Sequence, residues 1–323
     1  MAEVLTHTLV LALDIGGTNS RGEVLQWDGE ALSDPIASAS LPTPTGDGDA
    51  AITTIAHVCN QLLDALTDEQ RTLVRAVGLG VPGVLDSETG IVKMASNLGW
   101  FNRNVAGELH DLVGLPVHLM HDVTAAGIAE QRLGAGRGHD DVLAVFLGTG
   151  IAATLITGGR VIRGGLTASG TRQPAGEIGH MPLVMNGPLC GCGQRGCLEL
   201  YCSARNVGRI YSETLGIDPA GPDAKTSKDV VHNLATDPVA REVWDTATRN
   251  LAYGLFTATM VTGPSLIILG GGLSAAGDVL VEAVHKHFTD FARVVEVPHI
   301  VVAALGQRAG ILGVALTTIE RSA

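Results

Sequence analysis

The segment Asp14-Ile15-Gly16-Gly17-Thr18 brings together three kinds of group that bind phosphate or a metal ion. Glycines let backbone N–H groups approach phosphate oxygens, the threonine hydroxyl adds a donor, and a carboxylate at a strand end can hold Mg²⁺ through water. A tight hairpin turn with a capping aspartate is the alternative interpretation of the same residues. We interpret the segment as a phosphate-binding turn, with Asp14, Gly16, Gly17 and Thr18 as its ligand contacts.

Two further glycine-rich turns are expected to bind the same kind of ligand. Gly148-Thr149-Gly150 follows an apolar run just as the first turn does, and Gly270-Gly271-Gly272 ends the buried run 266–269. Two Gly-Thr turns suit phosphates held between two lobes, and three glycines would let the base and ribose of a nucleotide lie on the backbone. For the three glycines, a plain strand-to-helix turn is the alternative. Together the turns predict a nucleotide site.

A histidine and three cysteines form the next cluster. Cys190, Cys192 and Cys197 fall within eight residues, and His180 precedes them. Thiolates and an imidazole in tetrahedral array suit Zn²⁺, and four protein ligands make a closed, structural site. A redox pair or unpaired buried thiols are the alternatives. We therefore expect these four side chains to hold a structural zinc ion.

The apolar pattern predicts the elements that position these residues. Apolar runs alternate with helix-period segments, which is typical of an α/β protein. We expect strands at 9–13, 21–27, 76–81, 116–120, 142–147, 152–157 and 266–269. We expect helices at 50–66, 124–133 and 307–319, and a loop leading into the first helix at 33–49. The strand 116–120 delivers His121 and Asp122 at its C-terminal end.

A weak internal duplication is the best indication of domain organisation. Two strand–turn–strand units begin at Leu9 and at Val142. A chain of 323 residues suggests two domains at about 150 residues each. We expect a small α/β lobe of residues 1–122, completed by the C-terminal helix 307–323, and a large α/β lobe of residues 123–306.

Composition argues against several classes of protein. Hydrophobic residues make up 46% of the chain and charged residues 17%, which excludes intrinsic disorder. The formal net charge of −12 argues against nucleic acid or an anionic membrane as a partner, because both need a basic face. The uncharged stretch 251–277 is broken at Gly263-Pro264 and again at the three glycines, so we interpret it as a buried helix and a buried strand. With no targeting signal in the sequence, we expect a cytoplasmic protein.

A series of short motifs, taken in chain order, resembles the pattern of the ROK family (repressor, open reading frame, kinase). The ExGH and CxCGxxGCxE segments are the most specific, and the match covers about residues 8–320. The matching motifs are Asp14–Thr18, Pro82-Gly83, Asn97–Trp100, Asp122, Gly148–Gly150, Glu177–His180, Cys190–Gly193, Gly196–Glu199 and Gly270–Gly272. The resemblance implies the actin-like, ribonuclease-H-like ATPase fold, with two lobes and a central cleft. It also implies ATP with Mg²⁺, a hexose substrate, and a homodimer or homotetramer.

The resemblance also implies roles for individual residues. Asp122 would be the general base that takes the proton of the sugar's 6-hydroxyl as this oxygen attacks the γ-phosphorus of ATP. A helix cap is the alternative for this aspartate. His180 would bind zinc through one ring nitrogen and sugar through the other, so that zinc orients the sugar site and does not activate water. The residues expected to bind the sugar's hydroxyls alongside Asp122 are Asn97, Glu177, His180 and Glu199.

One departure from the family pattern concerns the identity of the sugar. The family usually has asparagine directly before the catalytic aspartate, where this chain has His121. Histidine can imitate one of the two hydrogen-bonding functions of an amide, yet it is bulkier. We expect His121 to contact the sugar and glucose to be the acceptor, with N-acetylglucosamine or N-acetylmannosamine as the alternative.

A sugar-responsive transcriptional repressor is a further alternative, because the same family contains such proteins. Repressors need an N-terminal helix-turn-helix, whereas only about eight residues precede the first expected strand. Polyphosphate as phosphoryl donor gains no support from an acidic chain, because a long polyanion needs a basic channel. We therefore expect an ATP-dependent hexose kinase, glucokinase-like in its substrate.

Overall fold

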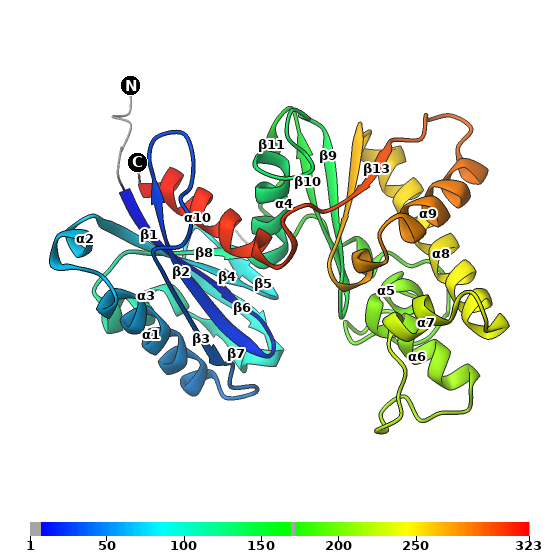
Figure 1. Cartoon of the computed structure of the whole chain (residues 1–323), viewed down its shortest axis with the longest axis horizontal. Helices are drawn as coiled ribbons and strands as arrows, with labels where there is room; N and C mark the ends of the chain where they lie inside the picture. Colours follow the sequence, from blue (N-terminus) through cyan, green and yellow to red (C-terminus); the bar gives the residue numbers. More distant parts are fainter. Residues whose placement is uncertain (1–7, 169–171, 323) are drawn as a thin grey trace. The chain divides into compact units, whose positions relative to one another are not determined.

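The computed structural model describes residues 8–168 and 172–322, and these form two compact units (Figure 1). The first unit contains the described residues of 1–129, 165–173 and 307–323, and the second contains 130–164 and 174–306. Each unit is built around a five-stranded sheet of mixed strand direction. The α/β class predicted from the apolar pattern is confirmed.

The main sheet of the first unit has the strand order β3-β2-β1-β4-β8. β1, β2 and β3 are antiparallel neighbours, whereas β4 runs parallel to β1 and β8 runs parallel to β4. A small antiparallel sheet, β5-β6-β7, lies in the same unit. The elements are β1 (Thr8–Ile15), β2 (Asn19–Trp27), β3 (Ala37–Pro42), α1 (Gly48–Asp64), α2 (Asp68–Thr72), β4 (Val74–Val81), β5 (Val84–Asp86), β6 (Ile91–Ala95), η1 (Ser96–Leu98), β7 (Trp100–Arg103), α3 (Val105–Val113), β8 (Val117–His121) and α10 (Ala309–Ser322).

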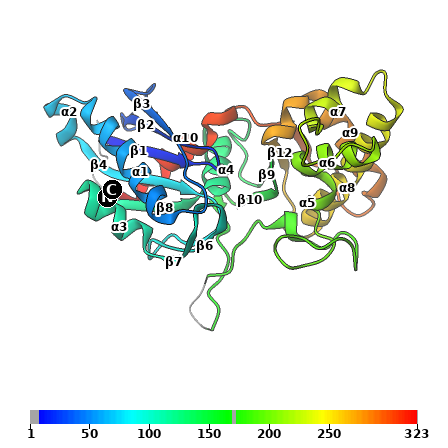
Figure 2. The same ribbon diagram turned by 90° about the horizontal axis from the view of Figure 1, so that it is seen from below.

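Helices cover both faces of this sheet, and α1, α3 and α10 gather around it in Figure 2. Successive side chains of a strand point to opposite faces, and Leu9, Leu11 and Leu13 of β1 share a core with α1. On the other face, α10 packs on β1 and β4. Gly78 of β4 permits this close approach, because a Cβ there would overlap the Thr318 hydroxyl.

The sequence prediction of a loop over residues 33–49 was wrong in part. β3 lies within this segment and pairs with β2, from Ala37 opposite Val24 to Pro42 opposite Asn19. It is the edge strand, and its residues alternate between half-buried and exposed. Alternating alanine and serine give little apolar contrast, and Pro42 is tolerated because it stands at the end of an edge strand.

The sheet of the second unit has the order β11-β10-β9-β12-β13. Its core contains alternate residues of β9 (Leu143, Val145 and Leu147) together with apolar residues of the long helix α8. The uncharged stretch 251–277 forms the end of α8 and then the buried strand β12, as expected. The elements are β9 (Val142–Leu147), β10 (Ile151–Thr157), β11 (Arg160–Val161), η2 (Ile178–His180), α5 (Glu199–Cys202), α6 (Ala204–Thr214), α7 (Ser227–Asn233), α8 (Pro238–Thr262), β12 (Leu266–Gly270), η3 (Gly272–Ala276), α9 (Asp278–Phe291) and β13 (His299–Val302).

The two sheets have one topology, which confirms the internal duplication. In both, three antiparallel strands are followed by two parallel strands, so that β1, β2, β3, β4 and β8 correspond to β9, β10, β11, β12 and β13. Both glycine-rich turns, Gly16-Gly17 and Gly148–Gly150, connect the first strand of a sheet to the second. Corresponding positions of the two halves therefore carry corresponding turns.

Helix α4 (Asp122–Arg132) and the turn η4 (Gly306–Arg308) carry the chain between the units. The contacts keep α4 with the first unit as far as Ala129, whereas the sequence placed the boundary after residue 122. α4 stays with α10 because Gly313 packs directly on the backbone of Ala125, where a Cβ would overlap its carbonyl oxygen. Within the described part of the chain, we find no helix with the length and apolar character needed to cross a bilayer.

Candidate active site

The phosphate-binding turn predicted at Asp14–Thr18 is the hairpin between β1 and β2. The N–H of Gly16 donates to the carbonyl oxygen of Asn19 (N to O 3.0 Å) and closes the turn. Gly17 and Thr18 are exposed at its tip. The hairpin interpretation and the ligand interpretation are therefore compatible, because the same tight turn leaves backbone groups accessible to an anion.

Asp14 is a largely buried carboxylate at the C-terminal end of β1. Burial raises its pKa from 3.8 to about 6, and the charge of Asp122 adds to the rise while Arg21 opposes it. Arg21 lies directly opposite Asp14 on β2. The carboxylate also lies against Gly310 at the start of α10. A buried carboxylate whose charge is this costly fits a cation-binding group, because a bound cation would offset that cost.

Asp122 and His121 lie at the junction of β8 and α4, as the sequence predicted. The two side chains are about one third and one quarter exposed, and His121 Nδ1 is 3.5 Å from Asp122 Oδ1. Asp122 Oδ1 also accepts a hydrogen bond from the N–H of Val123 (2.7 Å). The donor is the next residue along the chain, whereas a helix N-cap accepts from the second or third residue of the helix. The charge of Asp122 also acts on Asp14, whose pKa it raises.

Asn97 is exposed in η1 and lies beside the phosphate-binding turn. The side-chain nitrogen Nδ2 of Asn97 is the group nearest to the position that a Cβ at Gly17 would take. The backbone carbonyl oxygen of Asn97 accepts from the N–H of Gly46 (2.9 Å). The adjoining Trp100 is fully buried and donates from Nε1 to the carbonyl oxygen of Gly48 (2.9 Å). This anchor explains why an exposed asparagine holds a defined position.

In the second unit, Glu199 connects the glycine-rich turn to the cysteine cluster. A Cβ at Gly150 would meet Glu199 Oε2, so the carboxylate lies directly on the turn. The thiol of Cys190 donates to Glu199 Oε1 (3.1 Å), and His180 Nδ1 is 3.7 Å from the same oxygen. The Gly148–Gly150 turn, Glu199 and the cluster therefore form one continuous site.

The four predicted zinc ligands converge. Their donor atoms all lie within 4.8 Å of one another. Cys192 Sγ is 3.7 Å from Cys197 Sγ, and Cys190 Sγ is 3.8 Å from His180 Nδ1. A tetrahedral zinc with Zn–S bonds of about 2.3 Å has its sulfur ligands about 3.8 Å apart. The donor set and its spacing fit a structural zinc ion.

The thiols of the cluster differ in acidity. Burial raises the pKa of the Cys190 thiol to about 12. Burial opposes ionisation of Cys192 as well, but hydrogen bonds from the Gln194 N–H and from neighbouring thiols outweigh it and lower that pKa to about 7. Zinc binds the thiolate form, which Cys192 reaches most readily of the two.

The orientation of His180 matches the double role that the resemblance implies. Its Nδ1 faces the cluster, while Nε2 is 4.0 Å from Glu177 Oε2. The segment carrying both residues lies flat on β10, because Cβ atoms at Gly176 and Gly179 would overlap the carbonyl oxygens of Ala153 and Ile151. One ring nitrogen is therefore directed to the metal ligands and the other to the predicted sugar contacts.

The three glycines at 270–272 have different surroundings. A Cβ at Gly270 would meet the Phe146 ring, and one at Gly271, whose φ is +80°, would meet the Leu147 backbone next to the Gly148 turn. Both are needed for strand packing. Gly272 has open space around it and lines a pocket of about 320 Å³. Among the three, Gly272 is the position where a ligand would meet bare backbone.

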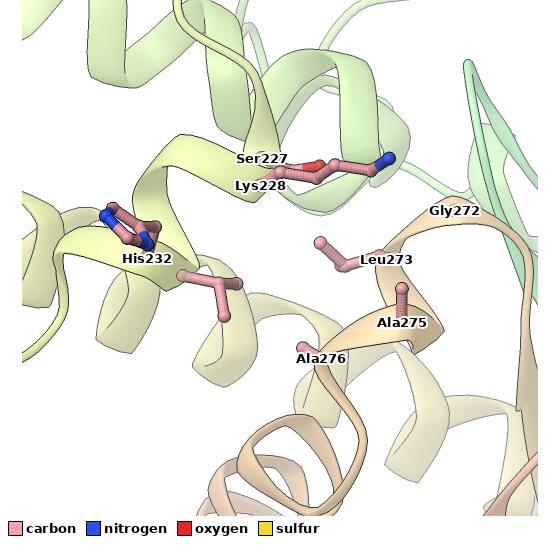
Figure 3. Close-up of a pocket in the computed structure, with 8 residues that line it drawn as sticks. Ser227, Lys228, His232, Gly272, Leu273, Ala275 and Ala276 are labelled. Carbon is pink, nitrogen blue, oxygen red and sulfur yellow. The ribbon is translucent and has the colours of Figure 1, made fainter.

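That pocket lies between α7 and η3 (Figure 3). Ser227 and Lys228 lie on the α7 side, and the small side chains of η3 face them. The full lining is Ser227, Lys228, Val231, His232, Gly272, Leu273, Ala275 and Ala276. Apart from Gly272, sequence reasoning missed these residues. The Thr226–Asp229 capping box signals only a helix start, and nothing in the segment marks a ligand site.

The predicted site residues fall into two groups, each assembled by one unit. The first unit holds Asp14, Gly16, Gly17, Thr18, Asn97, His121 and Asp122. The second holds Gly148, Thr149, Gly150, Glu177, His180, Cys190, Cys192, Cys197, Glu199 and Gly270–Gly272. Each unit thus offers a glycine-rich turn with acidic side chains near it.

Comparison with known proteins finds relatives over nearly the whole chain. The model of the ROK family matches residues 10–321. A glucokinase from Halalkalibacterium halodurans is 32% identical over 316 residues, covering 94% of this chain and 92% of that protein. The N-acetylgalactosamine kinase AgaK from Shewanella sp. is 32% identical and covers 94% of each chain. A solved structure of a ROK family glucokinase from Streptomyces griseus, in complex with glucose and AMPPNP, matches with a TM-score of 0.79 at 29% identity, covering 96% of this chain and 98% of that chain.

Duplicated sheets, each with a glycine-rich turn after its first strand, define the actin-like ATPase fold, and the class within it is that of the sugar kinases. Within that class, the chain belongs to the ROK family.

Proposed function

We propose that this sugar kinase transfers the γ-phosphoryl group of ATP to the 6-hydroxyl of glucose. The observation that carries the proposal is the pair of carboxylates at the C-terminal ends of β1 and β8, two strands of one sheet that are separated by β4. Asp14 is partly exposed to solvent, yet burial of its carboxylate and the charge of Asp122 raise its pKa to about 6, and Asp122 is itself partly exposed beside His121. A phosphotransferase needs one carboxylate for the metal–nucleotide complex and one for the acceptor's proton.

Asp122 is the proposed general base. Its carboxylate takes the proton of the sugar hydroxyl while the hydroxyl oxygen forms a bond to the γ-phosphorus. The bond from that phosphorus to the β–γ bridging oxygen breaks, and ADP leaves with the electron pair. Its hydrogen bond from Val123 holds the carboxylate at the start of α4. That contact supports the assignment because a base must keep one orientation.

The side chains proposed to bind the hydroxyls of the sugar are Asn97, His121, Asp122, Glu177, His180 and Glu199. Polar groups built to pair with hydroxyls reject a sugar that leaves them unpaired. The cluster would hold zinc through His180 and the three cysteines. The contacts of the Cys190 thiol with His180 Nδ1 and with Glu199 Oε1 support a role of this cluster in positioning the His180 and Glu199 side chains.

The nucleotide is proposed to bind through the glycine-rich turns and the pocket beside Gly272. Phosphates suit the exposed turns at Gly16–Thr18 and Gly148–Gly150. The pocket offers apolar side chains of η3 with Ser227 and Lys228 nearby, which is the mixture that a base and ribose require. Asp14 is the group proposed to hold Mg²⁺ through water.

A second candidate function is an N-acetylhexosamine kinase. It is favoured by His121, whose ring lies beside Asp122 where the family usually has asparagine. The likeness to the Shewanella N-acetylgalactosamine kinase also keeps this alternative open. Glucose remains the preferred assignment, because glucokinases of several organisms match at 30–32% identity, whereas the N-acetyl-D-glucosamine kinase of Vibrio vulnificus matches at 28%.

The decisive experiment is a coupled assay of ADP release with ATP and Mg²⁺. The acceptors are glucose, mannose, fructose, N-acetylglucosamine, N-acetylmannosamine and N-acetylgalactosamine. We expect the highest kcat/KM with glucose, and direct detection of glucose 6-phosphate as the product. A higher value for an N-acetyl sugar would replace the glucose assignment with the alternative, and no turnover with any of the six would overturn both.

A further inference from the structure

Two basic side chains of the second unit are exposed and unpaired: Lys228 on α7 and Arg205 on α6. In the described part of the chain, no hydrogen bond or ion pair engages the ammonium group of Lys228 or the guanidinium group of Arg205. Exposed basic residues are common on protein surfaces. What distinguishes these two is their place beside the pocket and beside the Gly148–Gly150 turn.

Lys228 lines the pocket beside Gly272. Its side chain extends toward the Gly272 end of the pocket and away from His232 (Figure 3). Among the described residues that line the pocket, none is acidic. The pocket therefore carries a lysine charge that no carboxylate of its lining balances.

The Gly272 end of the pocket adjoins the glycine-rich turn of the same unit. A Cβ at the neighbouring Gly271 would meet the backbone of Leu147, the residue that precedes the turn. A nucleotide with its base in the pocket and its terminal phosphates at the turn would therefore pass Gly272 with its ribose and first phosphate. Lys228 lies on this path.

Arg205 lies at the turn itself. Its backbone N–H donates to the carbonyl oxygen of Gly148 (N to O 3.3 Å) and ties the start of α6 to the turn. Gly208, three residues later on the same face of α6, packs on the segment that leads into α7, because a Cβ there would meet the carbonyl oxygen of Lys225. One helix thus joins the turn to the helix that lines the pocket.

A negative charge also lies on the turn, because a Cβ at Gly150 would meet Glu199 Oε2. Phosphates bound there would be repelled by this carboxylate. A cation held at the same turn offsets such repulsion. Arginine suits this task because its guanidinium group matches the geometry of phosphate oxygens, and lysine binds phosphate as a point charge.

We propose that these two side chains bind successive phosphates of the nucleotide, Lys228 the α-phosphate and Arg205 the β- and γ-phosphates. The inference rests on the proposed function and adds two residues to its nucleotide site. It also accounts for the binding of a polyanion by a chain with a net charge of −12: the two unpaired cations lie where the phosphates pass, so the repulsion from the rest of the chain is offset locally.

Three nucleotides of increasing length separate the two roles: AMP, ADP and AMPPNP. Calorimetry on the full chain in one magnesium buffer measures their dissociation constants, with AMP measured by displacement of AMPPNP. Lys228→Met removes the charge and keeps an unbranched side chain, so we expect all three constants to rise about 10-fold. Arg205→Met should leave the constant for AMP within about 2-fold and raise those for ADP and AMPPNP about 10-fold, because AMP has no phosphate that reaches the turn.

Two further variants separate the effect of charge from a change in structure. Lys228→Arg keeps the positive charge and should bind all three nucleotides within about 3-fold of the wild type. Lys286→Met is the matched control, because Lys286 is an exposed lysine of α9 that does not line the pocket. Its three constants should equal those of the wild type.

Unchanged binding in Lys228→Met or in Arg205→Met would overturn the inference. So would a loss of AMP binding in Arg205→Met, a loss in Lys228→Arg as large as in Lys228→Met, or a comparable loss in Lys286→Met. A wild type that binds ADP and AMPPNP but not AMP would also overturn it, because Lys228 would then have no phosphate of its own. Failure of the proposed function has a different signature, since the wild type would bind none of the three nucleotides.

Discussion

At the scale of single residues, the proposed chemistry depends on two carboxylates in unequal environments. Asp14 is largely buried and Asp122 is partly exposed, and the charge of one raises the pKa of the other. Such pairs allow two chemically identical groups to take different tasks, because the environment sets which one carries charge at working pH. The proposed division assigns the buried group to the cation and the accessible group to the sugar proton.

Replacing the proposed base should remove turnover and leave sugar binding intact. Asp122→Asn keeps the size of the side chain and abolishes its basicity, so we expect kcat to fall by about 10²-fold or more. Steady-state kinetics measures kcat, and calorimetry measures glucose affinity, which should change little. Asp111→Asn, at an exposed position on α3, is the control. Turnover close to that of the wild type would remove Asp122 from the catalytic role.

The raised pKa of Asp14 predicts how stability depends on pH in magnesium-free buffer. The unfolded chain releases this proton near pH 4, whereas the folded protein keeps it until about pH 6. The folded state therefore binds more protons in between, and stability is lost as pH rises through that range. Asp14→Asn removes the charge, so the variant should be more stable than the wild type at pH 7.5, by up to about 3 kcal/mol. The difference should vanish below pH 4.

Urea unfolding of both proteins from pH 4 to pH 8 measures this difference. Asp111→Asn should show no comparable pH-dependent gain. If Asp14→Asn were less stable than the wild type at pH 7.5, the folded protein would favour the charged carboxylate, contrary to the effect of burial.

At the scale of elements, a short irregular segment carries much of the proposed sugar site. The stretch from Gly176 to Glu199 contains little regular structure beyond η2, yet it holds Glu177, His180 and all three clustered cysteines. Irregular chain of this kind needs an additional constraint to hold side chains in place. A metal ion bound by the four convergent side chains of the cluster would supply such a constraint.

Loss of one ligand should therefore affect both metal content and sugar affinity. We expect about one zinc per chain in the wild type, and at least a fivefold lower content in Cys192→Ser. Because the proposed zinc ion would orient His180 and Glu199, kcat/KM for glucose should fall about 10- to 100-fold. Plasma mass spectrometry and the coupled assay measure the two effects. Cys202→Ser alters a buried thiol outside the cluster and should retain the metal. A wild-type protein free of zinc would contradict the assignment.

At the scale of the whole molecule, charge bears on the choice of phosphoryl donor. The chain has 33 acidic and 21 basic residues, so its summed field repels long polyanions. A nucleotide can still bind through local turns and a bound cation. We therefore expect polyphosphate to support less than about one hundredth of the rate seen with ATP. Direct detection of glucose 6-phosphate, at equal concentrations of donor phosphoryl groups, checks this. A comparable rate would reveal a local basic channel that net charge conceals.

Much of the fold follows from local pattern. Buried runs such as 142–147 and 266–269 predicted β9 and β12 at nearly their observed bounds, and two similar strand–turn–strand units predicted the duplicated sheets. Elements with a weaker contrast between apolar and polar positions were missed, as β3 shows. An edge strand of alternating small residues forms because β2 offers it unpaired backbone groups, and that partner lies elsewhere in the sequence.

The sequence by itself determined which groups could do chemistry: the turn at Asp14–Thr18, the spacing of the cysteines, and a carboxylate at the end of a strand. These features depend on residue type and short-range spacing, and both can be read from the sequence. Only the tertiary structure decided which distant residues meet. It placed Glu199 on Gly150, seated a pocket between α7 and η3, and gave Glu130 three backbone donors, two of them about 175 residues away. Such encounters depend on packing between elements, and no local pattern encodes them.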